Sequence, residues 1–284
     1  MRVYAILFCI VLAGMSCEDV IDVDVPSEPP RLSIDALLRL NDTTAASQTV
    51  QVRASLTSSF FGDVVPTSLE SIVMTNPDYV PQGPEDSNTL LLNEIAPGLY
   101  EGNKATDFFT QGTISLSISH EGQRYLATTA FAPAAPIDRL SQGDGNLFSE
   151  EETEVVIAFT DDIQTDNFYV FDFDFNEYLV SEDEFYQGQT FEFSYFYDDG
   201  VAPGMEITVE ILGADRGFYN YMNQLIAQSD GGAQGPFQTP SATVRGNVVN
   251  VTNSGTPNAS EDVDNFALGY FAISQTFTQD LLIE

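Results

Sequence analysis

A period-two alternation of aromatic and polar residues constrains the fold of this chain more than any other feature of its sequence. In Phe168–Asn176, phenylalanine occupies every second position from Phe171 onward, and aspartate stands between these positions. In Thr190–Tyr197, aromatic residues again occupy every second position from Phe191 to Tyr197. Because successive side chains of a strand point to opposite faces, both segments predict β-strands with one aromatic and one polar face. We expect the aromatic faces to form a core and the polar faces to meet solvent.

Short segments rich in Val, Ile, Thr and Phe, separated by turn residues, fill the first half of the chain. The seven strands predicted there are Leu32–Leu40, Thr49–Thr57, Ser68–Thr75, Leu90–Asn93, Leu99–Gly102, Thr113–Ser119 and Gln123–Phe131. Seven short strands of this kind are typical of an Ig-like β-sandwich. Ala132–Pro136 then interrupts the pattern, so we predict an N-terminal sandwich over 32–133 and a second domain over 137–284.

The second half is also β-rich but contains one helical segment. Phe218, Tyr221 and Met222 recur at helical spacing, and Asp215 precedes them as a candidate N-cap. We therefore predict a helix near 215–228. The further strands predicted there are Glu154–Phe159, Glu206–Leu212, Ala242–Val249 and Ala267–Phe277. The expected fold class is mainly β, with an Ig-like sandwich followed by a second β-rich domain that carries one α-helix.

The first residues read as an export signal over 1–16. Arg2 precedes an apolar stretch too short to span a bilayer, which takes about 20 apolar residues, and a small residue stands directly before Cys17. This pattern resembles a bacterial lipoprotein signal, in which the cysteine is lipidated and becomes the first residue of the mature chain. The alternative is an ordinary signal peptide cut elsewhere. An acidic, proline-containing tether is predicted over 17–31.

Two acidic residues, Glu18 and Asp19, follow Cys17 directly. Acidic residues at this place resemble the surface-export signal of Bacteroidota lipoproteins. The alternative is a solvated tether without a sorting role. The predicted location is the outer membrane, with the folded part held by a lipid anchor and facing the cell exterior.

Five segments together resemble the domain-of-unknown-function 4249 family of Bacteroidota outer-membrane lipoproteins. They are Glu18–Pro26, Pro30–Ile34, Phe218–Tyr221, Val244–Val248 and Leu268–Phe271. The resemblance covers nearly the whole mature chain. It implies an outer-membrane protein of the kind often encoded beside TonB-dependent receptors, and the family supplies no established catalytic residues.

Charge narrows the classes of partner. The chain has 43 acidic and 9 basic residues, a net charge of −34, and Lys104 is its one lysine. Such a surface repels phosphate backbones, so nucleic-acid binding is excluded on composition. It also disfavours electrostatic docking on anionic lipid. A cationic partner, divalent cations or simple solubility remain as interpretations.

The residue types needed for most catalytic sites are scarce. Cys9 and Cys17 both lie in the export region and His120 is the one histidine, which argues against a disulfide, a zinc site or a His-based triad in the folded part. Carboxylates cluster at Asp161-Asp162, Asp172/Asp174, Glu182-Asp183-Glu184, Asp198-Asp199 and Glu261-Asp262/Asp264. Calcium suits such oxygen ligands, but none of the clusters has the EF-hand spacing, and a solvated face is the favoured interpretation. We predict no enzyme activity and no cofactor, with Ca²⁺ as the open alternative.

Two pairs of adjacent aromatic residues stand apart from the alternating strands. Phe60-Phe61 and Phe108-Phe109 cannot both face inward if each pair lies on a strand. At least one member of each pair is therefore expected to be exposed near a loop. These four residues are candidates for contact with a partner protein.

Two functions remain open on this sequence, and a third is disfavoured. The first is an accessory or binding subunit of an outer-membrane β-barrel system, in particular a TonB-dependent transporter. The second is a stand-alone surface module that binds glycan, peptide or divalent cations, for which an aromatic stripe or a carboxylate-lined site would serve. A hydrolase would need two carboxylates of opposed pKa across a cleft.

Overall fold

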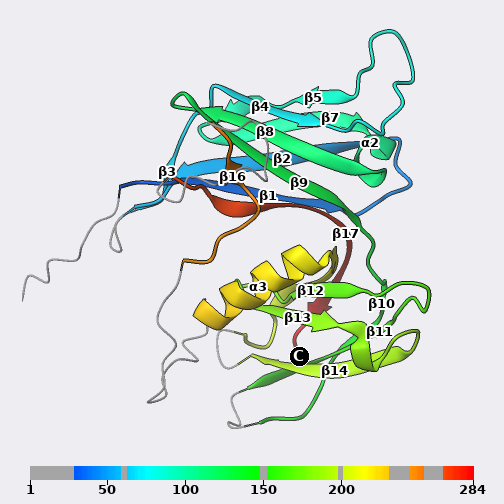
Figure 1. The fold of residues 1–284 in the computed structure, drawn as a ribbon. Coiled ribbons are helices and arrows are strands. Elements are labelled where there is room, and N and C mark those ends of the chain that lie inside the picture. The colour runs from blue at the N-terminus through cyan, green and yellow to red at the C-terminus, as the bar shows by residue number, and fades with distance from the viewer. Residues whose placement is uncertain (1–28, 59–62, 148–151, 198–200, 230–242, 253–264) are drawn as a thin grey trace, which may run out of the picture.

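The computed structural model describes residues 29–58, 63–147, 152–197, 201–229, 243–252 and 265–284. These residues form two β-sandwiches, one from the first half of the chain and one from the second, with helix α3 beside the second (Figure 1). The predicted fold class is confirmed. Among the described residues, no helix combines the length and apolar character needed to cross a membrane.

The first sandwich has two layers whose strands pair antiparallel, apart from the parallel pairs made by the C-terminal strand that connects the layers. One sheet contains β1 (Leu32–Leu40), β2 (Ser47–Leu56), β3 (Val65–Pro66), β6 (Asn93–Ala96) and β7 (Leu99–Ala105). The other contains β4 (Ser71–Thr75), β5 (Thr89–Leu91), β8 (Thr113–His120), β9 (Gln123–Ala132) and the short β16 (Val249–Asn250). The β8–β9 hairpin turns at Glu121-Gly122, and both residues have a positive φ.

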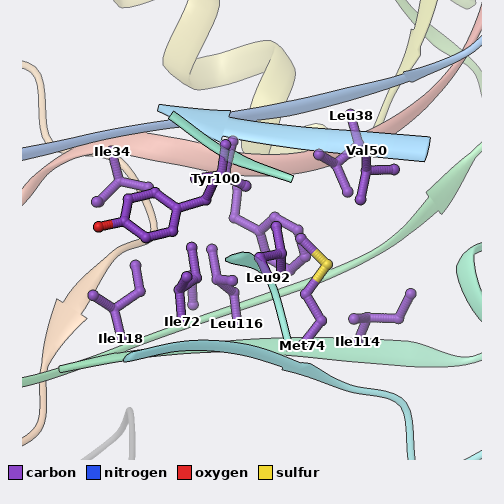
Figure 2. Close-up of a cluster of buried hydrophobic side chains, with 14 of the residues drawn as sticks. Ile34, Leu38, Val50, Ile72, Met74, Leu92, Tyr100, Ile114, Leu116 and Ile118 are labelled. Carbon is purple, nitrogen blue, oxygen red and sulfur yellow. The ribbon is translucent and has the colours of Figure 1, made fainter. Parts of the chain in front are cut away.

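The core of this sandwich lies between the two sheets. Every second residue of β1, from Leu32 to Leu40, is buried, which is the pattern of a strand with one face in a core. Figure 2 shows the side chains from both sheets meeting, among them Ile34, Leu38, Val50, Tyr100, Ile72, Met74, Ile114, Leu116 and Ile118. At about 25 cal/mol per Å² of buried apolar surface, this contact is the main source of stability for the sandwich.

Strand β17 (Leu268–Leu282) belongs to both sandwiches. Its first part pairs in parallel with β1, from Ser33↔Leu268 to Leu40↔Gln275. Its second part pairs antiparallel with β15 (Glu206–Ala214). Residues from the C-terminal end also enter the first core, namely Val248, Ala267, Phe271 and Ile273. The predicted range 32–133 is therefore incomplete for the first sandwich, because a parallel pairing across more than 200 residues leaves no local signal in the sequence.

The second sandwich encloses an aromatic core. A three-stranded sheet of β10 (Ile137–Gln142), β11 (Thr153–Thr160) and β14 (Thr190–Tyr197) faces a sheet of β12 (Phe168–Asp172), β13 (Tyr178–Glu182), β15 and β17. Phe171 and Phe173 are fully buried, and the ring of Phe173 stacks on Tyr195 at 3.8 Å between centroids. The predicted aromatic faces thus form core. Phe175 differs: it is 48% exposed at positive φ in the turn after β12.

Helix α3 (Arg216–Ser229) begins where the sequence predicts. The backbone N–H of Phe218 donates to Oδ1 of Asp215 at 2.7 Å, so Asp215 is the N-cap. The helix covers the face of β12 opposite the aromatic core, and Phe218 packs there with Phe168 and Val170. Both faces of β12 are consequently buried. The prediction that its aspartate face meets solvent is therefore wrong for Asp172, which is 9% exposed.

Candidate functional site

The residues predicted from the export region lie outside the described residues. These are Cys17, Glu18 and Asp19, and the same holds for Phe60 and Phe61. Lipidation, surface export and a contact through the Phe60-Phe61 pair therefore stay predictions.

The prediction for Phe108 and Phe109 is wrong. Both side chains are fully buried in the first core, so neither is exposed for a partner. The reason is that they lie in a short helix, α2 (Thr106–Thr110), rather than on a strand. Adjacent helical residues point about 100° apart, so both rings reach the core when the helix closes one end of the sandwich. The rings meet edge to face, with centroids 5.2 Å apart.

The acidic clusters divide into buried and exposed members. Asp161, Asp172 and Asp183 are at most 9% exposed, so the solvated-face interpretation fails for them. The clusters at 198–199 and 261–264 lie outside the described residues. Within the described ranges, no three His, Cys, Asp or Glu side chains are grouped so as to hold a metal ion.

Two acidic segments that are separate in the sequence come together in the second sandwich. We call residues 161–167 and 183–189 the loop pair. Asp161 accepts hydrogen bonds from the Tyr169 hydroxyl at 2.5 Å, from Asn167 Nδ2 at 3.2 Å and from the Gly188 N–H at 2.8 Å. Asp183 accepts from the Asn167 N–H at 2.8 Å and donates its own N–H to the Asn167 carbonyl at 3.2 Å. A buried polar network therefore joins the two loops.

Burial also raises the pKa of two groups in this network. Burial raises the pKa of the Asp183 carboxyl, and Asp161 nearby adds to the effect. Burial and the hydrogen bond to Asp161 likewise raise the pKa of Tyr169. A carboxyl whose folded pKa is raised favours folding most below its unfolded pKa, near 4, and this contribution is lost as pH rises through the folded value. The contribution of Asp183 to stability is therefore greatest at acidic pH.

A recess of about 260 Å³ lies against the first loop. It is lined by Pro133–Pro136, Thr160, Asp161, Asp162, Thr165, Asn167 and Tyr169. The polar atoms of Asp161, Asn167 and Tyr169 are engaged in the network described above. The recess is therefore small and mostly preorganised, with a carboxylate and an amide in its wall.

A second recess, of about 200 Å³, lies where the two sandwiches meet. It is lined by Arg39, Asp172, Asp174, Thr208 and Glu210. Arg39 from β1 binds Asp172 of β12 at 2.8 Å and also contacts Glu210 of β15. The Asp172 and Glu210 side chains are 13% and 12% exposed. One guanidinium of the first sandwich thus bridges two nearly buried carboxylates of the second.

Replacing this arginine is expected to weaken the joint between the sandwiches. Arg39→Met should cost about 2 kcal/mol of unfolding free energy, because it leaves two poorly solvated carboxylates without their cation. Arg139→Met is the matched control. Its pair with Glu192 is more than half exposed on both sides, and such pairs contribute about 0 to 1 kcal/mol. Urea unfolding of both variants tests the difference, and equal losses would contradict a joint at Arg39.

The described segments that carry the family resemblance converge around β1 and the first part of β17. Gly269, at φ +94°, lies directly against the Ile34 carbonyl, and Gly246 lies against Gly269. Asn247 exchanges two hydrogen bonds with the backbone of Phe271, each at 2.8 Å. The contacts join β1, the 243–252 segment and β17.

Aromatic and cationic side chains from these segments also pack against one another. The guanidinium carbons of Arg31 and Arg245 lie 4.0 Å and 3.8 Å from the ring centroid of Phe266. The Tyr270 ring packs on Phe218 of α3, with centroids 5.2 Å apart. Residues from four parts of the sequence therefore build one packed joint, and close backbone approach explains why two of them are glycines.

These features define a class of protein: two β-sandwiches that share one strand and are joined by motif segments distant in the sequence. Residues 18–280 match the family described as domain of unknown function, DUF4249, and the chain belongs to that family. The predicted family is confirmed. A comparison with curated proteins found no match.

Proposed function

We propose that this protein is an outer-membrane lipoprotein that serves as an accessory subunit of a β-barrel, in particular a TonB-dependent transporter. The observation that carries the proposal is the export segment that ends in a small residue and Cys17. Lipid on Cys17 would hold the fold at the membrane, with Glu18 and Asp19 directing it to the cell exterior. Several acyl chains give durable anchoring where one would be marginal.

The folded part suits a binding role. The first described strand starts at Leu32, so a short segment would separate the lipid from two sandwiches that share β17. A fold tied through one continuous strand presents its surfaces in fixed relation, and this lowers the entropic cost of docking on a second rigid protein. The chain belongs to DUF4249. The family resemblance implies a protein of the kind often encoded beside TonB-dependent receptors, and this is consistent with the proposal.

The alternative is a stand-alone surface module that binds glycan, peptide or divalent cations. The recess of about 260 Å³ favours it, because a carboxylate and an amide line its wall. Binding there would require no stable membrane partner. Thermal unfolding with and without millimolar CaCl₂ checks the cation branch of this alternative.

The proposal is tested on the full chain, expressed in its export form and purified from gently solubilised outer membranes. The wild-type protein is expected to fractionate with membranes and to co-purify with a β-barrel in near-equal amount. Cys17→Ser, which removes the thiol that would take the lipid, is expected to leave the membrane fraction. A wild-type preparation without any membrane partner would overturn the accessory role. A Cys17→Ser protein that stays in the membrane would overturn the anchor.

A further inference from the structure

The two most exposed large hydrophobic side chains among the described residues both belong to the loop pair. Phe185 is 86% exposed and Ile163 is 71% exposed. Single exposed hydrophobic residues are common on protein surfaces. Two highly exposed hydrophobic side chains on two loops that are hydrogen-bonded to each other require an explanation.

The backbone holds the two loops in contact. Gly188, three residues after Phe185, lies so close to Ile163 that a Cβ atom on the glycine would be 2.6 Å from the Ile163 Cβ. Gly188 also has φ +68°, where glycine carries little strain. In addition, the Asp161 N–H donates to the Gln189 carbonyl at 3.1 Å. The two loop tips are therefore neighbours in space.

The buried network beneath the tips makes them rigid. Asp161, Asn167 and Asp183 are all under 9% exposed and are hydrogen-bonded to one another or to the facing loop. Loops that are ordered before binding lose less conformational entropy when they bind. An aromatic side chain carried by such an ordered loop resembles the anchors that dominate protein interfaces.

The charged residues around the two loop tips indicate which kind of partner surface would be complementary. Asp162, Asp166 and Glu184 are exposed beside Ile163 and Phe185, and the loop pair contains no lysine or arginine. Arg216, which reaches this region from α3, is paired with Glu182 at 3.4 Å. An apolar tip with an acidic surround is complementary to an apolar pocket rimmed by lysine or arginine.

We propose that Phe185 and Ile163 are the docking contact for the β-barrel partner, whose surface there is an apolar pocket with a basic rim. This inference rests on the proposed function and adds the site and the partner chemistry. The side chains have no part in either core, so removing them leaves the fold intact.

The test compares three forms of the full-length lipidated chain in the same membrane purification. Phe185→Ala combined with Ile163→Ala is expected to lower the amount of co-purifying barrel at least tenfold. Val80→Ala is the matched control, since Val80 is 70% exposed on the first sandwich, and it should retain the barrel as wild type does. Thermal midpoints of all three forms should agree. For the wild type, the retained barrel should fall as NaCl is raised from 50 to 500 mM, because the rim contact is electrostatic.

Each outcome decides a different point. If the double variant keeps the barrel as wild type does, the docking contact is overturned and the accessory role stands. Retention that does not change with salt overturns the basic rim. If wild type itself brings down no barrel, the proposed function fails, and this inference fails with it.

Discussion

Gly269→Ala is expected to destabilise the protein by about 3 kcal/mol or more, enough to unfold a marginally stable chain. Two effects add at this position. The residue adopts φ +94°, which L side chains rarely adopt, and a methyl group there would overlap the carbonyl oxygen of Ile34. The first effect costs about 1 to 2 kcal/mol. The second forces β17 away from β1, along the pairing that completes the first sandwich.

A second glycine separates these two effects. Gly204 has a similar φ of +90°, but nothing lies within 4 Å of the position of its missing Cβ. Gly204→Ala should therefore show the cost of the backbone conformation alone. Urea unfolding of both variants, followed by circular dichroism, gives the difference directly. Equal losses in the two variants would show that the approach of Gly269 to Ile34 contributes nothing.

Individual strands and the helix could be predicted because the residue pattern of each element lies within its own segment of the sequence. β1 and β14 have the predicted bounds, Leu32–Leu40 and Thr190–Tyr197, since alternation marks a strand with one buried face. Helix α3 follows from Asp215 and the helical spacing after it. The joint between the sandwiches could not be predicted, because β17 reaches β1 across most of the chain and no local pattern records that contact.

The site was harder to predict than the fold, for a related reason. The acidic loops were visible as clusters, but their burial depends on which segments face each other. Asp161 and Asp183 are buried because each accepts hydrogen bonds from a loop far from it in the sequence. Ile163 stands alone among polar residues, and this is the one sequence signal that marks the exposed tip. Whether such a residue turns inward or outward is decided by the tertiary structure.

Phe108→Ala and Phe109→Ala are each expected to cost about 3 to 5 kcal/mol of unfolding free energy. Both rings have no exposed surface, and truncation of a buried phenylalanine loses its transfer free energy and leaves a cavity. The Phe108 ring also packs edge to face on Tyr79, with centroids 5.4 Å apart. The backbone carbonyl of Phe108 accepts a hydrogen bond from the side chain of the buried Asn76 at 2.7 Å. A cavity at Phe108 would therefore lie beside a hydrogen bond that holds α2 in place.

Phe185→Ala supplies the matched control for this prediction. The same chemical change at a ring that is 86% exposed should alter stability by no more than about 0.5 kcal/mol. Guanidinium unfolding of the three variants measures the contrast. A loss below about 1 kcal/mol for Phe108→Ala would contradict a structural role for α2 and would reopen its phenylalanine pair as a surface contact. A large loss there, beside a neutral Phe185→Ala, shows that the phenylalanine of α2 stabilises the core and that the exposed ring of Phe185 does not.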